Sequence, residues 1–305
     1  MKDLHLHLSG STSPSLLFEI ISETGIKIKE KNYWQFLDAI NMKSDKINSL
    51  DDYIKMLEVI DETQSSPRAV ELSFFDSYKN SFMSGCDYLE LRWNPYKRSK
   101  EFKIDLDKLI VAAKSGFEKA NSIFGINGDM ILCMGRDCTE IQNESIFKKA
   151  IQYFKKGIIG IDVAGPESKV PLKPEFEQYY KIANALGIMT TIHCGEPYYD
   201  GVENTLSTIL DKYKPKRIGH GIQIHRYPKL MKQASSMGIT FEICMTSNLM
   251  SKSVKKKEDF IPIFKAFEEY QIKHVLCTDN LFSINTNILK EHVLYDELKD
   301  LSKKI

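Results

Sequence analysis

Two histidines alternate with leucines close to the start of the chain, in the run Leu4-His5-Leu6-His7-Leu8. In a β-strand, residues i and i+2 point to the same face, so both imidazoles would project from one side while the leucines pack on the other. Neutral imidazoles are favoured ligands of Zn²⁺. The spacing therefore predicts part of a metal site, and a pair of barrel-lining polar residues without a metal is the open alternative.

Further polar residues follow strand-like runs at their carboxyl ends. They are His193, Glu196, His220 and Asp279. In barrel enzymes the carboxyl ends of the strands build the active site, so these side chains are expected to meet at one mouth. Three histidines and one aspartate from this group and the first run would suffice to hold one hydrolytic metal ion, with a position left for water.

One metal ion is favoured over two by the fourth strand-like run. A two-metal site commonly needs a bridging residue, such as a modified lysine on that strand. The run Ile158–Val163 contains no lysine. We therefore expect a single ion per chain, and zinc suits the histidine-rich ligand set.

Eight short β-type runs are available to position these residues, and helical patterns separate most of them. The runs are Asp3–Leu8, Tyr88–Trp93, Met130–Cys133, Ile158–Val163, Met189–His193, Arg217–Gly219, Thr240–Cys244 and His274–Thr278. This alternation predicts an α/β fold, a (β/α)8 TIM barrel. The stretch before Tyr88 is too long for one crossover and predicts a helical insertion after the first strand, packed over the barrel mouth. No linker divides the chain, so one domain is expected over 1–305.

Composition and charge exclude several classes of function. The 305 residues carry 42 Lys+Arg and 41 Asp+Glu, a formal net charge of +1, which gives no electrostatic footprint for nucleic acid. No apolar run reaches the roughly 18 to 20 residues of a membrane span. The six cysteines lie mostly in apolar runs and resemble small buried residues more than a disulfide framework. We therefore expect a cytoplasmic protein that binds neither membrane nor nucleic acid.

Six motifs occur in order along the chain: HLHL at 5–8, GIDVAGPE at 160–167, HCGE at 193–196, RIGHG at 217–221, FEICMTSNL at 241–249 and CTDN at 277–280. Together they resemble the adenosine deaminase family of metal-dependent amidohydrolases, from residue 1 to about 280. The resemblance implies a single zinc ion on four ligands, namely His5, His7, His193 and Asp279. It also implies Glu196 as the acid that protonates a purine ring nitrogen, His220 as the residue that orients the metal-bound water, and Gly165 as a backbone donor to another ring nitrogen.

The chemistry that these roles require follows from elementary principles. Zinc lowers the pKa of its water from about 15.7 toward about 7, so hydroxide is available at neutral pH. Attack at C6 of adenine builds negative charge on the ring, and a protonated Glu196 would offset it. Burial would raise the pKa of Glu196 in that direction. Asp279 must stay ionised, and its second oxygen can accept a proton from the attacking water. The products would be a 6-oxo purine and ammonia.

Two departures from the family pattern bear on the substrate. The run His7-Leu8-Ser9-Gly10-Ser11-Thr12 lacks the acidic residue that contacts the ribose 5'-hydroxyl in adenosine-specific members, and Ser9, Ser11 and Thr12 could donate to a 5'-phosphate instead. Asn280 replaces the second Asp of the usual TDD triplet and is placed by the resemblance on the imidazole edge of the purine. His7 joins these residues as an expected substrate contact.

Three functional readings remain at this point. The leading one is zinc-dependent hydrolytic deamination of adenosine and 2'-deoxyadenosine to inosine and 2'-deoxyinosine. The second is deamination of a 5'-phosphorylated or N6-substituted nucleotide such as N6-methyl-AMP to give IMP, because the HLxGS pattern and the CxTSN run at 244–248 also resemble that branch. The third is a catalytically silent metal-binding barrel, since a fold alone does not determine function. The sequence leaves the oligomeric state open.

Overall fold

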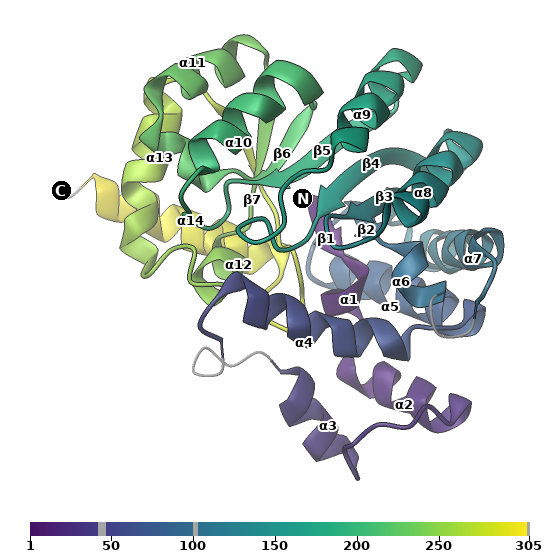
Figure 1. The fold of residues 1–305 in the computed structure, drawn as a ribbon. Helices are drawn as coiled ribbons and strands as arrows, with labels where there is room; N and C mark the ends of the chain where they lie inside the picture. Colours follow the sequence, from purple (N-terminus) through teal and green to yellow (C-terminus); the bar gives the residue numbers. More distant parts are fainter. Residues whose placement is uncertain (42–46, 100–102, 304–305) are drawn as a thin grey trace.

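Eight parallel strands follow one another in chain order around a barrel (Figure 1). The computed structural model describes residues 1–41, 47–99 and 103–303. The strands are β1 (Lys2–His7), β2 (Tyr88–Trp93), β3 (Asn127–Gly135), β4 (Ile158–Ala164), β5 (Met189–Cys194), β6 (Arg217–His220), β7 (Thr240–Ile243) and β8 (Lys273–Leu276). Each strand pairs with the next one along the chain. The predicted α/β class and (β/α)8 architecture are confirmed.

The segment after β8 joins the last strand to the first. The backbone N–H of His7 donates to the carbonyl of Asp279 over 2.8 Å, and the N–H of Asp279 donates to the carbonyl of His5 over 2.7 Å. Asp279 therefore belongs to the backbone hydrogen bonding that closes the barrel, and its side chain is placed beside the histidines of β1.

The predicted strand runs agree with the structure except at their ends. The strand β3 begins at Asn127 instead of Met130, because residues 127–129 pair with residues 88–90 of β2. Asn, Gly and Asp are depleted in strands, so the hydrophobic pattern does not report these first three positions. The difference leaves the residues at the carboxyl ends of the strands in place.

Helices cover the outside of the barrel and part of its mouth (Figure 1). They are α6 (Pro95–Ser99), α7 (Leu106–Phe124), α8 (Glu140–Tyr153), α9 (Pro174–Leu186), α10 (Val202–Thr208), α11 (Pro228–Ser236), α12 (Met245–Met250), α13 (Phe260–Glu269) and α14 (Ile288–Ser302). The ends of α9 illustrate the local signals: Pro174 occupies its first turn and Gly187 caps its last turn with φ +73°. A π-helical turn (Ile209–Tyr213) and short 3₁₀ turns (Ile222–Arg226, Lys257–Asp259) complete the set.

The predicted helical insertion lies between β1 and β2. It consists of α1 (Leu8–Ser11), α2 (Pro14–Thr24), α3 (Tyr33–Ile40), α4 (Leu50–Thr63) and α5 (Pro67–Met83). The last helix, α5, packs Val70, Phe74 and Tyr78 into the main core of the barrel. By contrast, α2, α3 and α4 share a small core of their own, built on Leu17, Phe36, Ile60 and their neighbours. The insertion is thus anchored to the barrel by α5.

The helix α4 reaches from the small core to the mouth of the barrel (Figure 1). The Ser49 hydroxyl caps its start by accepting the N–H of Asp52, and two acidic residues in the first turn suit the positive end of the helix dipole. One side of α4 lines the main pocket with Leu50, Tyr53, Leu57 and other residues. Within the described ranges, no helix is both long and apolar enough to cross a membrane.

Candidate active site

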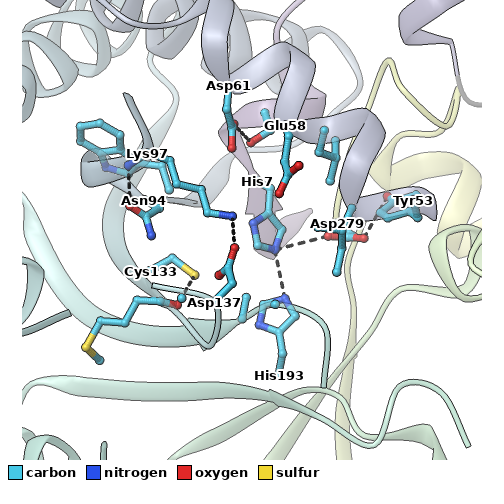
Figure 2. Close-up of a pocket in the computed structure, with 18 of the residues that line it drawn as sticks. His7, Tyr53, Glu58, Asp61, Asn94, Lys97, Cys133, Asp137, His193 and Asp279 are labelled. Carbon is cyan, nitrogen blue, oxygen red and sulfur yellow. Dashed lines mark hydrogen bonds and ion pairs between the residues drawn. The ribbon is translucent and has the colours of Figure 1, made fainter. Parts of the chain in front are cut away.

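Four side chains converge at the carboxyl ends of β1, β5 and β8. They are His5, His7, His193 and Asp279, and one ligand atom from each lies within 4.8 Å of the other three. The Nε2 atoms of His7 and His193 are 3.0 Å apart, and His7 Nε2 is 3.4 Å from Asp279 Oδ1 (Figure 2). The structure therefore brings together the four residues that the resemblance assigns to zinc.

The chemistry of these four residues fits a divalent cation. His5 Nε2 is buried and has no hydrogen-bond partner among the described residues, and it points at the cluster 3.6 Å from Asp279 Oδ1. Burial lowers the pKa of both His5 and His7 well below the usual histidine range, so their rings are neutral. A buried nitrogen without a partner is costly, and a cation among these lone pairs would satisfy it. Three imidazoles and one carboxylate are suitable ligands for zinc.

Two buried carboxylates orient the imidazoles from behind. Glu242 on β7 accepts from His5 Nδ1 over 2.8 Å, and Asp162 on β4 accepts from His193 Nδ1 over 3.1 Å. These contacts hold the ring protons on Nδ1 and turn both Nε2 lone pairs toward the cluster. Arg92 lies between the carboxylates, 3.0 Å from Asp162 and 2.9 Å from Glu242. Although burial opposes it, the contact with His193 and the charge of Arg92 hold the pKa of Asp162 far below its usual range.

The two carboxylate oxygens of Asp279 face different groups. Its Oδ1 faces the histidines, whereas Oδ2 accepts hydrogen bonds from the hydroxyls of Ser247 (2.5 Å) and Tyr53 (3.2 Å). The residue has φ +63°, in the left-handed region that is uncommon for a residue with a side chain. Strained backbone of this kind is often found at functional sites, where surrounding contacts hold it.

Glu196 lies in the same pocket and is buried. Its Oε1 accepts hydrogen bonds from the Ser251 hydroxyl (2.7 Å) and the Asn248 amide (3.3 Å) at the end of α12. Burial, reinforced by the charge of Asp279, raises the pKa of Glu196 to about 7. A carboxyl group with this pKa holds a proton over part of the neutral range and can donate it to a substrate.

His220 stands between Glu196 and the cluster, with φ +59°. Its Nε2 is 3.7 Å from Glu196 Oε2, and its Nδ1 is 3.0 Å from the Asn248 amide nitrogen. Because the amide N–H can only donate, Nδ1 accepts and Nε2 carries the proton of the neutral ring. Burial lowers the pKa of His220 to about 4. The geometry thus presents a neutral imidazole N–H at the edge of the metal cluster.

The remaining predicted contacts fall in different places. Ser9 and Gly165 line the pocket, and Gly165 has φ +122°, a conformation that L side chains rarely adopt. Asn280 is fully buried and is not brought to the pocket wall; its amide nitrogen donates to the Tyr53 hydroxyl over 2.5 Å. Ser11 and Thr12 also turn away, because both hydroxyls donate to the carbonyl of Leu8. Of the three hydroxyl residues after His7, only Ser9 faces the pocket.

Several residues of the site were not recognised from the sequence. They are Tyr53, Asp61, Arg98, Asp162, Glu242, Ser247, Asn248 and Ser251. A usable signal existed for Asp162 and Glu242, since a charged residue inside an apolar strand-like run is exceptional and needs a partner. The run 244–248 carried a second usable signal, because polar residues directly after a strand lie at the mouth of the barrel. No comparable signal marks the residues of α4.

The comparisons with known proteins agree with this geometry. The family model described as adenosine deaminase matches residues 1–304. The adenosine deaminase of Vibrio vulnificus (strain CMCP6) is 27% identical over 290 residues, covering 95% of this chain and 85% of that protein. The adenosine deaminase of Clostridium botulinum (strain 657 / Type Ba4) is 26% identical over 304 residues, covering 98% and 88%.

Solved structures share the fold over nearly the whole chain. The N6-mAMP deaminase of Arabidopsis superposes with a TM-score of 0.83 at 25% identity, covering 99% of this chain and 88% of that one. An adenine deaminase from Arthrobacter aurescens gives a TM-score of 0.84 at 17% identity, covering 98% and 88%, which is evidence for the fold alone. With the family model matched from end to end and the barrel in place, the chain belongs to the adenosine deaminase family and is an aminohydrolase.

Proposed function

We propose that the protein is a zinc-dependent hydrolase that deaminates adenosine and 2'-deoxyadenosine to inosine and 2'-deoxyinosine, with release of ammonia. The observation that carries the proposal is the position of Glu196. Its buried carboxyl group, with a pKa raised to about 7, shares one pocket with His7, His193 and Asp279 of the candidate metal cluster. An acid and a metal cluster facing one cavity are what hydrolysis of an aromatic amine requires.

The residues divide the work of this reaction. When bound by His5, His7, His193 and Asp279, zinc would supply the acidity that makes water a nucleophile at neutral pH. Glu196 donates a proton to the ring nitrogen beside the carbon under attack, which offsets the negative charge that builds there. The Nε2–H of His220 orients the attacking oxygen. Gly165 lets backbone approach the far edge of the purine, since it has no side chain to intervene.

Asn280 enters the proposal with a different role from the one the resemblance suggests. Its amide is engaged by Tyr53, whose hydroxyl also contacts Asp279. Tyr53 lines the pocket, and its hydroxyl is engaged by Asn280 and Asp279. We therefore assign Asn280 to the support of Tyr53, and through it to the positioning of α4 over the substrate.

The proposal extends to features that follow from the sequence. It includes one zinc ion per chain, a single domain over 1–305 and a cytoplasmic location. The ligand is a purine nucleoside, and no nucleic acid is bound. The ligands come from residue 5 and residue 279, so one site needs nearly the whole chain.

A second candidate keeps the chemistry and changes the substrate to a 5'-phosphorylated or N6-substituted nucleotide. The observation in its favour is Ser9, an uncharged hydroxyl residue at the pocket wall, together with the likeness to the Arabidopsis N6-mAMP deaminase.

The direct test follows absorbance at 265 nm with zinc-loaded protein and four substrates: adenosine, 2'-deoxyadenosine, AMP and N6-methyl-AMP. We expect the two nucleosides to be converted. Turnover of only the nucleotides would replace the first candidate by the second. Zinc binding without turnover of any purine would leave a metal-binding barrel and reject both.

A further inference from the structure

The pocket has a second end, away from the metal cluster. Glu58, Asp61, Lys97 and Asp137 line both the main pocket and an adjoining outer cavity, whereas the four candidate metal ligands line no part of that outer cavity. Figure 2 shows Glu58 and Asp61 descending from α4 and Lys97 meeting Asp137 across the pocket. This end, which we call the outer end, is where the part of a substrate remote from the reacting carbon must lie.

Asp61 is a charged group at the outer end whose position is fixed by two hydrogen bonds. It is buried, and its Oδ1 accepts hydrogen bonds from the Ser9 hydroxyl and from Arg98 Nη2, the latter over 2.8 Å. In the described part of the chain, nothing hydrogen-bonds its other oxygen, Oδ2. A fixed carboxylate with one free oxygen at a pocket wall is an acceptor prepared for a donor from the ligand.

Arg98 is not free to bind a negatively charged ligand. Its Nε and Nη2 donate to Gln64 Oε1 over 3.0 and 2.6 Å, and Nη1 donates to the carbonyl of Asn94 over 3.1 Å. Nη2 also contacts Ser9 and Asp61. The guanidinium is therefore engaged on every nitrogen by the protein, and its function at this site is to hold Asp61.

Lys97 is the other cation at the outer end, and it is paired as well. Its Nζ lies 3.0 Å from Asp137 Oδ2. Against burial, the charges of Asp61 and Asp137 raise the pKa of Lys97. Three carboxylates (Glu58, Asp61, Asp137) and two cations (Lys97, Arg98) line this end of the pocket, a balance of one negative charge. A doubly charged phosphate would be repelled here, whereas a hydroxyl would find an acceptor.

The shape of a purine nucleoside connects these observations. C6 lies on one side of the purine and N9 on the opposite side, so a base with C6 at the metal cluster sends its sugar toward the outer end. The 5'-oxygen is the part of the sugar that carries the phosphate in a nucleotide. We propose that Asp61, held by Ser9 and Arg98, is a specificity-determining residue that accepts a hydrogen bond from the 5'-hydroxyl and rejects a 5'-phosphate. This inference rests on the proposed deaminase function and decides between its two substrate classes.

The experiment compares two substrates on two proteins, each zinc-loaded and full length. Adenosine and 5'-deoxyadenosine differ only in the 5'-hydroxyl, and Asp61→Asn replaces the carboxylate by an amide of the same shape. For the natural chain, we expect kcat/KM to fall about 10- to 100-fold without the hydroxyl, the usual cost of leaving a buried acceptor unpaired. For Asp61→Asn, we expect kcat/KM for adenosine to fall by a similar factor, mainly through a higher KM. The value for 5'-deoxyadenosine should change little.

AMP supplies the charge test. The natural chain is expected to prefer adenosine over AMP by about 100-fold or more in kcat/KM, and Asp61→Asn should narrow that ratio at least about tenfold. Glu23→Gln is the matched control, because Glu23 is an exposed carboxylate on α2 of the insertion and lines neither the main pocket nor the outer cavity. It removes the same charge and should leave the ratio unchanged.

The outcomes separate this inference from the proposed function. If the natural chain converts AMP as well as adenosine, or is indifferent to the 5'-hydroxyl, the role of Asp61 is rejected while the deaminase function stands. If it converts no purine, the proposed function itself fails. The comparison of adenosine, 5'-deoxyadenosine and AMP on the natural chain needs no variant, so a poorly folding Asp61→Asn protein would not prevent a decision.

Discussion

The amide of Asn280 donates a hydrogen bond of 2.5 Å to the hydroxyl of Tyr53, which in turn donates to Asp279 Oδ2 over 3.2 Å. Tyr53 belongs to α4 of the insertion, whereas the two other residues follow the last strand of the barrel. The insertion is therefore joined to the candidate metal cluster by hydrogen bonds as well as by packing. The position of α4 beside the pocket and the orientation of Asp279 are therefore physically coupled.

Removing the Tyr53 hydroxyl is expected to weaken metal binding. Tyr53→Phe keeps the ring against Ile47 and Ile284 but leaves the Asn280 amide without its acceptor and Asp279 with one donor fewer. A lost buried hydrogen bond costs about 1–2 kcal/mol, so zinc affinity should fall about tenfold. Competition with a chelator measures it. Tyr295→Phe, which removes a hydroxyl on α14 outside the pocket, should bind zinc normally; equal affinities in the two variants would contradict the coupling.

The proton of Glu196 is expected to be essential for turnover and dispensable for metal binding. Glu196→Gln keeps the size of the side chain and its contacts with Ser251 and Asn248, but the amide is a very poor acid. General acid catalysis is worth roughly 10²–10⁴-fold, so activity should fall by that factor while zinc stoichiometry stays that of the natural chain. Near-normal rates would remove Glu196 from this role. The exposed Glu203→Gln serves as the control for charge loss alone.

The pH profile should carry the signature of the same group. Its pKa is raised to about 7, and the protonated form is the active one, so kcat/KM should fall about tenfold per unit above that pH. The Ser251 hydrogen bond lowers the pKa of Glu196. Ser251→Ala should therefore move the falling limb to higher pH. If the falling limb stays in place or moves to lower pH, it reports the titration of a group other than Glu196.

The carboxylate behind His193 is expected to govern metal affinity without touching the metal. Asp162→Asn leaves a neutral partner on the Nδ1 side of His193 and removes one of the two charges that pair with Arg92. Loss of such an outer carboxylate typically costs about 10–100-fold in metal affinity. Zinc titration measures the effect, and thermal unfolding with chelator present reports the separate loss of the buried ion pair. Asp129→Asn, at a half-buried position on β3, is the control; matching affinities would refute the orienting role.

The sequence determined the barrel and the polar residues that follow the carboxyl ends of its strands. Parallel strands in a closed barrel bring their carboxyl ends to one face, so His5, His7, His193 and Asp279 had to meet once the strand-like runs were recognised. Local chemistry was also readable, since a carboxyl such as Glu196 at a strand end lies where burial raises its pKa. These inferences depend on period-two patterning and on chain order, which a single sequence displays directly.

Only the tertiary structure decided which residues of the insertion line the pocket. The helix α4 is placed by packing among α2, α3 and the barrel mouth, and helical periodicity reports a buried face without naming what it contacts. Tyr53 and Asp61 could therefore not be identified as site residues from the sequence. Asn280 was expected to contact the ligand, but its amide donates to the Tyr53 hydroxyl. Likewise, the sequence shows only that Ser9 replaces an acidic residue. The structure shows that the Ser9 hydroxyl donates a hydrogen bond to the carboxylate of Asp61. Contacts between residues far apart in sequence follow from three-dimensional packing, which no local pattern encodes.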